Sequence, residues 1–108
     1  MATGRFGAVD ISSAATDTLL YTAPAGNFTV ATVSIVNRTN SSATVRLAIS
    51  SSSTTIANAE FLEYECEVLA HGVLERTGLV LQAGYSILFR SSILGVNAVA
   101  YGIETSTT

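Results

Sequence analysis

Residues 28–50 read FTVATVSIVNRTNSSATVRLAIS, and this stretch decides the fold class. Two runs rich in β-branched side chains flank a tight polar turn, Asn37 to Ser42, and predict two strands joined as a hairpin. Residues 28–36 are partly apolar on both faces, which favours a central strand covered on both sides. Residues 43–50 alternate between apolar and polar side chains, the period of a half-buried strand. The inward set of that second strand is expected to be Val45, Leu47 and Ile49.

The same succession of short strands and turns continues along all 108 residues. Turn chemistry separates the runs, as at residues 23–26 (Ala-Pro-Ala-Gly), where proline removes a ladder donor and glycine permits a sharp turn. About seven to eight strands at roughly 10-residue spacing predict an all-β, antiparallel β-sandwich or jelly roll in a single domain. The other expected strands are 6–11, 18–22, 61–69, 73–81, 85–90 and 96–104.

The two ends of the chain differ in composition from its middle. Residues 1–15 are rich in small side chains and weakly patterned, so we expect an extended N-terminal arm with a short strand at its end. Residues 16–104 are expected to form the sandwich. Residues 105–108 are polar and are expected to be a flexible tail.

The segment 57–69 fits two periods. Leu62, Cys66 and Leu69 have helical spacing, but Glu63 and Glu67 would then repel each other at i,i+4. Read as a strand, residues 62–68 alternate with period 2, and one face holds Leu62, Tyr64, Cys66 and Val68. We therefore predict a strand at 61–69. A short helical turn at 56–60 stays open as an addition to that strand.

A row of glutamates is the sharpest local feature of this predicted strand. Glu63, Glu65 and Glu67 would share one face at a spacing of roughly 6.5–7 Å. They could pair with arginines of a neighbouring subunit. They could also hold a calcium ion, although calcium needs about six to eight oxygens from a folded loop that the sequence lacks. The favoured interpretation is the solvated face of an edge strand, where charge blocks stray pairing.

Charged residues are scarce, at 12% of the chain, which is about half the usual share. All five basic residues are arginines, and Ser and Thr make up 27 of the 108 residues. Because charge-poor surfaces are easily desolvated, this composition favours a protein that works in an assembly. A soluble monomer kept in solution by its hydroxyl groups is the alternative. With a net charge of −3 and no basic stripe, we expect no nucleic-acid partner.

Candidate catalytic groups are few. Cys66, the single cysteine, excludes an internal disulfide and a cysteine-rich zinc site, and it alternates with apolar strand residues. His71, the single histidine, lies in a predicted turn. We therefore expect no enzyme activity, no cofactor and no metal. The first residues show no basic segment followed by an apolar run, and no apolar run approaches the roughly 20 residues of a membrane span, so we expect no signal peptide, synthesis in a cytosol and no membrane partner.

Six short motifs follow one another over most of residues 18–104. They are LYTAPAGN (20–27), VSIVNRT (33–39), VRLAI (45–49), LERTG (74–78), QAGY (82–85) and VNAVAYGIE (96–104). As a set they resemble the small β-sandwich structural proteins found in virions of tailed bacteriophages, including cyanophages. The resemblance implies a virion component without enzymatic activity that is often an oligomer.

From this resemblance we expect a capsid decoration or cement protein that binds and stabilises the assembled phage head. Its partners would be the major capsid protein or other virion proteins, and further copies of itself, with a homotrimer favoured. Arg38 and Arg46 are candidate anchors to an acidic shell surface, because arginine pairs with carboxylates through two parallel hydrogen bonds. A tail, neck, baseplate or fibre component is the first alternative. A receptor- or carbohydrate-binding module is the second.

Overall fold

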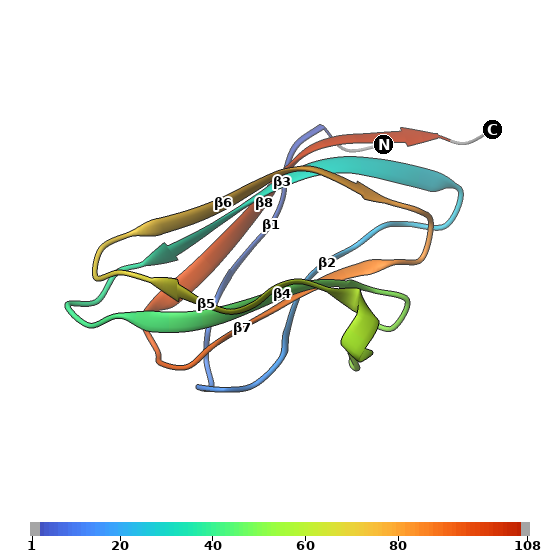
Figure 1. Ribbon diagram of the computed structural model, residues 1–108. Helices are drawn as coiled ribbons and strands as arrows, with labels where there is room; N and C mark the ends of the chain where they lie inside the picture. Colours follow the sequence, from blue (N-terminus) through green and yellow to red (C-terminus); the bar gives the residue numbers. More distant parts are fainter. Residues whose placement is uncertain (1–2, 107–108) are drawn as a thin grey trace.

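Two four-stranded antiparallel sheets face each other in a computed structural model that describes residues 3–106 (Figure 1). The elements are β1 (Thr3–Asp10), β2 (Thr18–Thr22), β3 (Asn27–Asn37), β4 (Ala43–Ser50), the 3-10 helix η1 (Asn58–Glu60), β5 (Phe61–Val68), β6 (Val73–Leu81), β7 (Ser86–Ser91) and β8 (Val96–Ser106). Sheet A has the strand order β1-β8-β3-β6, and sheet B has the order β2-β7-β4-β5. The predicted all-β sandwich is confirmed, and so is the strand assignment of the ambiguous segment.

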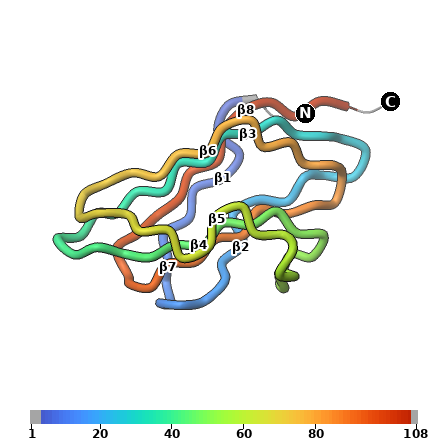
Figure 2. The backbone as a smooth tube through the Cα atoms, viewed as in Figure 1, coloured from blue at the N-terminus to red at the C-terminus, as the bar shows by residue number. Residues whose placement is uncertain are grey.

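The strand pairing makes the chain one long hairpin that is rolled into two sheets. β1 pairs with β8, β2 with β7, β3 with β6 and β4 with β5, all antiparallel. The pairings of β3 with β8 and of β4 with β7 then join these pairs into the two sheets. This is the jelly-roll topology of two interlocked Greek keys. Figure 2 shows the backbone as it crosses from one sheet to the other along the chain.

The polar turn of residues 38–42 connects strands of different sheets. β3 lies in sheet A and β4 lies in sheet B, so the predicted hairpin between them is wrong although both strands exist. The expectation that β3 is covered on both faces is also wrong. Its odd-numbered residues from Thr29 to Asn37 are buried, while the even-numbered ones are half-buried or exposed. Covering one face is enough because antiparallel sheets can leave the other face open.

The core fills the space between the sheets. The inward set predicted for β4 is confirmed, since Val45 and Leu47 are fully buried and Ile49 packs against the core. The strand β7 adds Ile87 and Phe89 from the same sheet. The largest apolar side chains that are fully buried in this core are Phe89, Ile35, Leu47, Leu81, Ile87, Val33, Val45 and Val96.

The N-terminal segment is part of the sandwich. Residues Thr3–Asp10 pair with β8 as an edge strand of sheet A, which differs from the expected extended arm. A side chain at Gly7 would place its Cβ 2.5 Å from the carbonyl oxygen of Leu20, so glycine is what permits this close approach of β1 to β2. At the other end, β8 continues to Ser106, so Thr105 and Ser106 belong to a strand. The remaining parts of the expected arm and tail, residues 1–2 and 107–108, lie outside the described residues.

Candidate interaction surfaces

Arginines on the surface are mostly engaged by carboxylates of the same chain. The ion pairs are Arg38–Asp10 at 2.5 Å, Arg46–Glu65 at 3.1 Å, Arg76–Glu63 at 2.8 Å and Arg90–Asp17 at 2.9 Å. Within residues 3–106, Arg5 is the arginine left without an ion pair. The two arginines proposed as anchors to an acidic partner are therefore already neutralised within the chain.

Arg46 is the centre of a cluster on the outer face of sheet B. Its guanidinium donates to both carboxylate oxygens of Glu65, at 3.1 and 3.2 Å, and lies 4.3 Å above the ring centre of Tyr64. The hydrogen bond from Arg46 lowers the pKa of Glu65 below its usual value, and the same bond raises the pKa of Arg46. Phe61 packs edge-on against the Tyr64 ring at 4.9 Å. These contacts hold the Arg46 side chain in place, against both a carboxylate and an aromatic ring.

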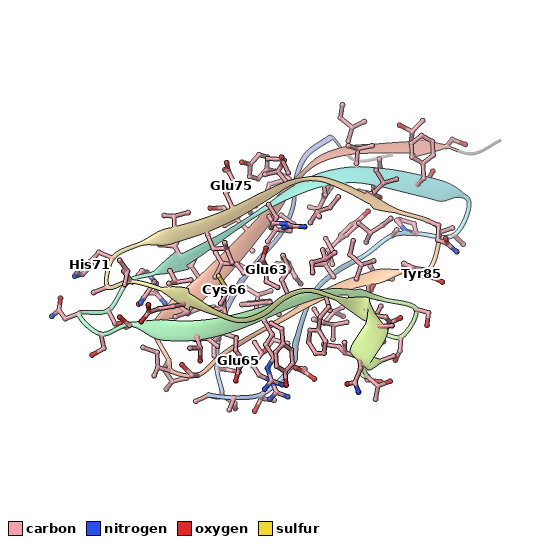
Figure 3. The ribbon with its side chains drawn as sticks, viewed as in Figure 1. Glu63, Glu65, Cys66, His71, Glu75 and Tyr85 are labelled. Atoms are coloured by element: carbon pink, nitrogen blue, oxygen red, sulfur yellow. The ribbon has the colours of Figure 1, made fainter. Side chains whose placement is uncertain are left out.

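The row of three glutamates does not exist, because a bulge in β5 breaks the alternation. Glu65 has a left-handed φ of 53°, and the pairing register between β4 and β5 shifts on both sides of Leu47. Glu63 consequently points between the sheets toward Arg76 of β6, while Glu65 lies on the outer surface (Figure 3). Glu67 is exposed and has no side-chain partner in the described part of the chain. A calcium site built from the three carboxylates is thereby contradicted.

Arg38 lies beside a shallow depression where β1, β3 and β8 end. Its guanidinium donates to the carboxylate of Asp10 and to the side-chain oxygen of Asn97 at 3.1 Å. The depression has a volume of about 390 Å³ and is lined by Ala8, Val9, Asp10, Arg38 and Asn97. It holds one acid and one base that already pair with each other, which leaves little unpaired charge for a ligand.

Asn37 ties together the loops at this end of the sandwich, a role that its place in a polar turn does not predict. The residue is fully buried. Its amide nitrogen donates to the carbonyl oxygens of Ser41, Val68 and Leu69 at 2.8–3.3 Å, and its side-chain oxygen accepts from the backbone N–H and hydroxyl of Thr39. The asparagine-rich turn is therefore held by a buried residue, although its composition suggests an exposed loop.

A buried acid lies between the sheets near the opposite end, and it was also missed. Glu104 on β8 is 5% exposed and accepts a hydrogen bond from the hydroxyl of Tyr21 on β2. Because a tyrosine hydroxyl carries one proton, the second contact, 2.9 Å to the Thr29 hydroxyl, is one that Thr29 donates. Burial, followed by the bond to Glu104, raises the pKa of Tyr21 to about 12. The alternation along β8 could have predicted this burial, since Glu104 directly follows Ile103, which faces outward.

His71 and Cys66 are not brought together as a catalytic pair. The imidazole Nε2 of His71 lies 2.6 Å from the side-chain oxygen of Asn40 in the turn region, and His71 has a left-handed φ of 58°. Cys66 is half-buried and packs against the core (Figure 3). Among residues 3–106, no three His, Cys, Asp or Glu side chains are grouped to hold a metal ion. The described residues also contain no helix of a length and apolarity suited to crossing a membrane.

The outer face of sheet A carries five of the nine large hydrophobic residues that are exposed among residues 3–106. Val80, Val30 and Ile103 are register partners on β6, β3 and β8, and their side chains are 61%, 42% and 53% exposed. Tyr101 and Val73 extend this patch along the sheet. We call the set Val30, Val73, Val80, Tyr101 and Ile103 the sheet A face. Isolated exposed apolar residues are ordinary, but a contiguous row across three strands is a candidate surface for association.

Comparison with protein-family models, curated proteins and solved structures returns no match to this chain.

Proposed function

We propose that this chain is a non-enzymatic structural protein of a tailed-phage virion that decorates and stabilises the assembled head. The observation that carries the proposal is the contiguous apolar row of the sheet A face. Covering such a row removes apolar surface from water, which is the main driving force of protein association. The motif resemblance supplies the virion context.

The scarcity of free charge supports an assembly role. The candidate anchors Arg38 and Arg46 are paired with Asp10 and Glu65, so neither presents an unpaired cation to a partner. Partner contact would thus depend on apolar burial and backbone complementarity, with charges at the rim setting orientation. The jelly roll is compatible with this role because viral capsid domains use it, but lectins and cupins use it as well, so the fold by itself does not choose among them.

The major capsid protein is the proposed partner, and copy number separates it from the tail, neck and baseplate alternatives. Quantitative mass spectrometry on purified particles of the phage that encodes the chain should find on the order of hundreds of copies per particle, as expected for a protein that follows the symmetry of the shell. A few dozen copies or fewer would indicate a tail or neck component. Absence of the chain from purified particles would overturn the proposal.

Binding to the shell can be tested with the purified protein and particles stripped of it. The wild-type protein should rebind and raise the temperature at which the heads release their DNA. A glycan array provides the opposing experiment. Reproducible sugar binding by the isolated protein, together with no rebinding to particles, would favour the carbohydrate-binding alternative.

A further inference from the structure

The two central strands of sheet A present no charge on their outer face. The outward side chains are the even-numbered residues of β3 from Phe28 to Val36 and the odd-numbered residues of β8 from Asn97 to Thr105, and all of them are neutral. Charges are found instead on the two edge strands, β1 and β6. An apolar centre with charged edges is the distribution expected of an interface with a core and a rim.

The charges at the two edges have opposite sign and lie at similar heights along the strands. Arg5 on β1 is the register partner of Tyr101 on β8, so it shares the outer face, and it has no ion pair in the described part of the chain. Glu75 on β6 is the register partner of Ser34 and accepts a hydrogen bond from the Tyr101 hydroxyl at 3.1 Å. Glu75 projects away from the sandwich in Figure 3. One edge therefore offers a free cation and the opposite edge offers an exposed carboxylate.

A two-fold axis parallel to the strands would place two such faces against each other with their opposite charges facing. The strand order β1-β8-β3-β6 is reversed by such an axis, so β1 of one copy lies over β6 of the other, and β8 lies over β3. Ile103 of one copy then meets Val30 of its partner copy, and Arg5 of each copy approaches Glu75 of the other. The offset between Arg5 and Glu75 along the strands is two residues, roughly 7 Å, which an arginine side chain can span.

We propose that two copies of this chain associate through their sheet A faces about this two-fold axis, with reciprocal Arg5–Glu75 ion pairs at the rim. The proposal rests on the assembly role proposed above and names a second copy of the chain as the occupant of the sheet A face, so the major capsid protein would contact the dimer through other surfaces. Sheets that pack face to face keep their strands within about 30° of each other, which the axis allows. The resulting dimer replaces the homotrimer expected from the motif resemblance, because a surface that pairs with itself across a two-fold axis has no place for a third copy.

The whole outer surface of sheet A, which includes the sheet A face, is large enough for a specific interface. Four strands at a spacing of about 4.8 Å and eight residues at about 3.4 Å each cover roughly 500 Å². The two faces together then bury about 1,000 Å², the size at which specific interfaces begin. The interface would accordingly be of the weaker kind in solution, and attachment to a shell that concentrates the copies would strengthen it.

The first test measures mass by light scattering coupled to size-exclusion chromatography, on the isolated wild-type chain over a range of concentrations. The expected result is a concentration-dependent shift toward twice the 11.2 kDa of one chain. Val30→Glu should weaken dimerisation by about tenfold or more, since it places two carboxylates in the apolar centre. Leu19→Glu is the matched control, because Leu19 has the same 42% exposure but lies on sheet B, and it should leave dimerisation unchanged.

The second test uses the fact that the two-fold axis forms the Arg5–Glu75 ion pair twice in each dimer. Arg5→Glu and Glu75→Arg should each weaken self-association by about tenfold at low salt, because each places like charges together twice. Mixing the two variants should restore dimerisation, since every rim contact in the mixed dimer again joins opposite charges. The double variant should also dimerise like the wild type.

Three results would overturn the dimer: a monomeric wild type at the highest concentration reached, a trimer, or charge variants that stay weak after mixing. Circular dichroism spectra matching the wild type are required of every variant. Because these measurements use isolated protein, a failed dimer leaves the head-binding result unaffected, and a failed head-binding result leaves the dimer unaffected.

Discussion

The hydroxyl of Tyr21 donates a hydrogen bond to the carboxylate of Glu104 across the space between the two sheets. Tyr21 belongs to β2 of sheet B, and Glu104 belongs to β8 of sheet A, 83 residues away in sequence. The Thr29 hydroxyl completes a chain of three polar groups in which each donates to the next. A carboxyl group that is 5% exposed depends on such donors, because burial removes its hydration. This polar link therefore fixes how β2 is placed against sheet A.

Tyr21→Phe should destabilise the fold. The substitution keeps the ring and its stacking with Phe6 but removes one hydrogen bond from a buried carboxylate, which costs about 1–3 kcal/mol in the free energy of unfolding. Urea denaturation with an unchanged m-value measures this loss. Tyr64→Phe is the control, because the Tyr64 ring is 60% exposed and its hydroxyl makes no hydrogen bond within residues 3–106. Equal losses for the two variants would contradict the role of the link.

Stability should fall in alkaline solution in a way that depends on Tyr21. Its pKa is raised from 10.0 to about 12 in the folded state, by burial and by the bond to Glu104. A group whose folded pKa is raised contributes stability that is complete below its unfolded pKa, so this contribution is lost as the pH rises from about 10 through 12. Unfolding free energies at about pH 9 and pH 11 should differ more in the wild type than in Tyr21→Phe. The raised pKa of Tyr101, which follows from its bond to Glu75, is common to both proteins.

Asn37→Asp tests whether the buried amide holds the turn. The change is nearly isosteric, but a carboxylate cannot donate to the three carbonyl oxygens that the amide nitrogen now contacts. We expect a loss of at least about 3 kcal/mol in unfolding free energy, measured by denaturant titration. The loss should shrink at about pH 4, because protonation restores one donor and removes the buried charge. Asn58→Asp, at an exposed position of η1, should change stability by less than about 0.5 kcal/mol.

Strands could be predicted from the sequence because alternation is a local signal. Val45, Leu47 and Ile49 repeat with period 2 and turn toward the core, as expected. The sheet to which each strand belongs could not be predicted, since β3 and β4 flank a turn whose composition is the same whether it closes a hairpin or crosses between sheets. The pairing of β1 with β8 joins the two ends of the chain and leaves no local trace in the sequence.

The direction in which a side chain points could not be predicted where a bulge interrupts the strand, as in β5. The left-handed φ at Glu65 sends Glu63 and Glu65 to different sides of sheet B, and no period-2 count can show this. Tyr64, expected beside Cys66 on the inner face, is 60% exposed for the same reason. On β8, Tyr101 and Ile103 share one face, as period 2 predicts, but that face is the outer one. The alanines Ala98 and Ala100, together with Glu104, face the core.

Ala15→Gly should stabilise the protein. Ala15 has a left-handed φ of 55° in the exposed connection between β1 and β2, and its N–H donates to the carbonyl oxygen of Ser91. Glycine adopts this φ without strain, and the gain exceeds its larger entropy loss on folding by roughly 0.5 kcal/mol. Ala14→Gly should lower stability instead, since Ala14 is exposed but does not have a left-handed φ. Thermal unfolding of the two variants measures the difference, and the same sign for both would contradict the strain at Ala15.

Arg46 should hold the pKa of Glu65 below its ordinary value. The hydrogen bond from Arg46 is the first cause that holds the pKa of Glu65 below its ordinary value, so the contact contributes stability above that ordinary pKa and loses it as the pH falls. Arg46→Lys should raise the pKa of Glu65, because a lysine cannot hold both carboxylate oxygens in a fixed fork. Carbon-13 NMR of the side-chain carboxyl groups follows each titration. The pKa of Glu60 is lowered by backbone N–H donors, Ala57 first, so it should stay in place in the same spectra. A shift of Glu60 together with Glu65 would indicate a general loosening of the fold, and an unmoved Glu65 would show that Arg46 does not hold it.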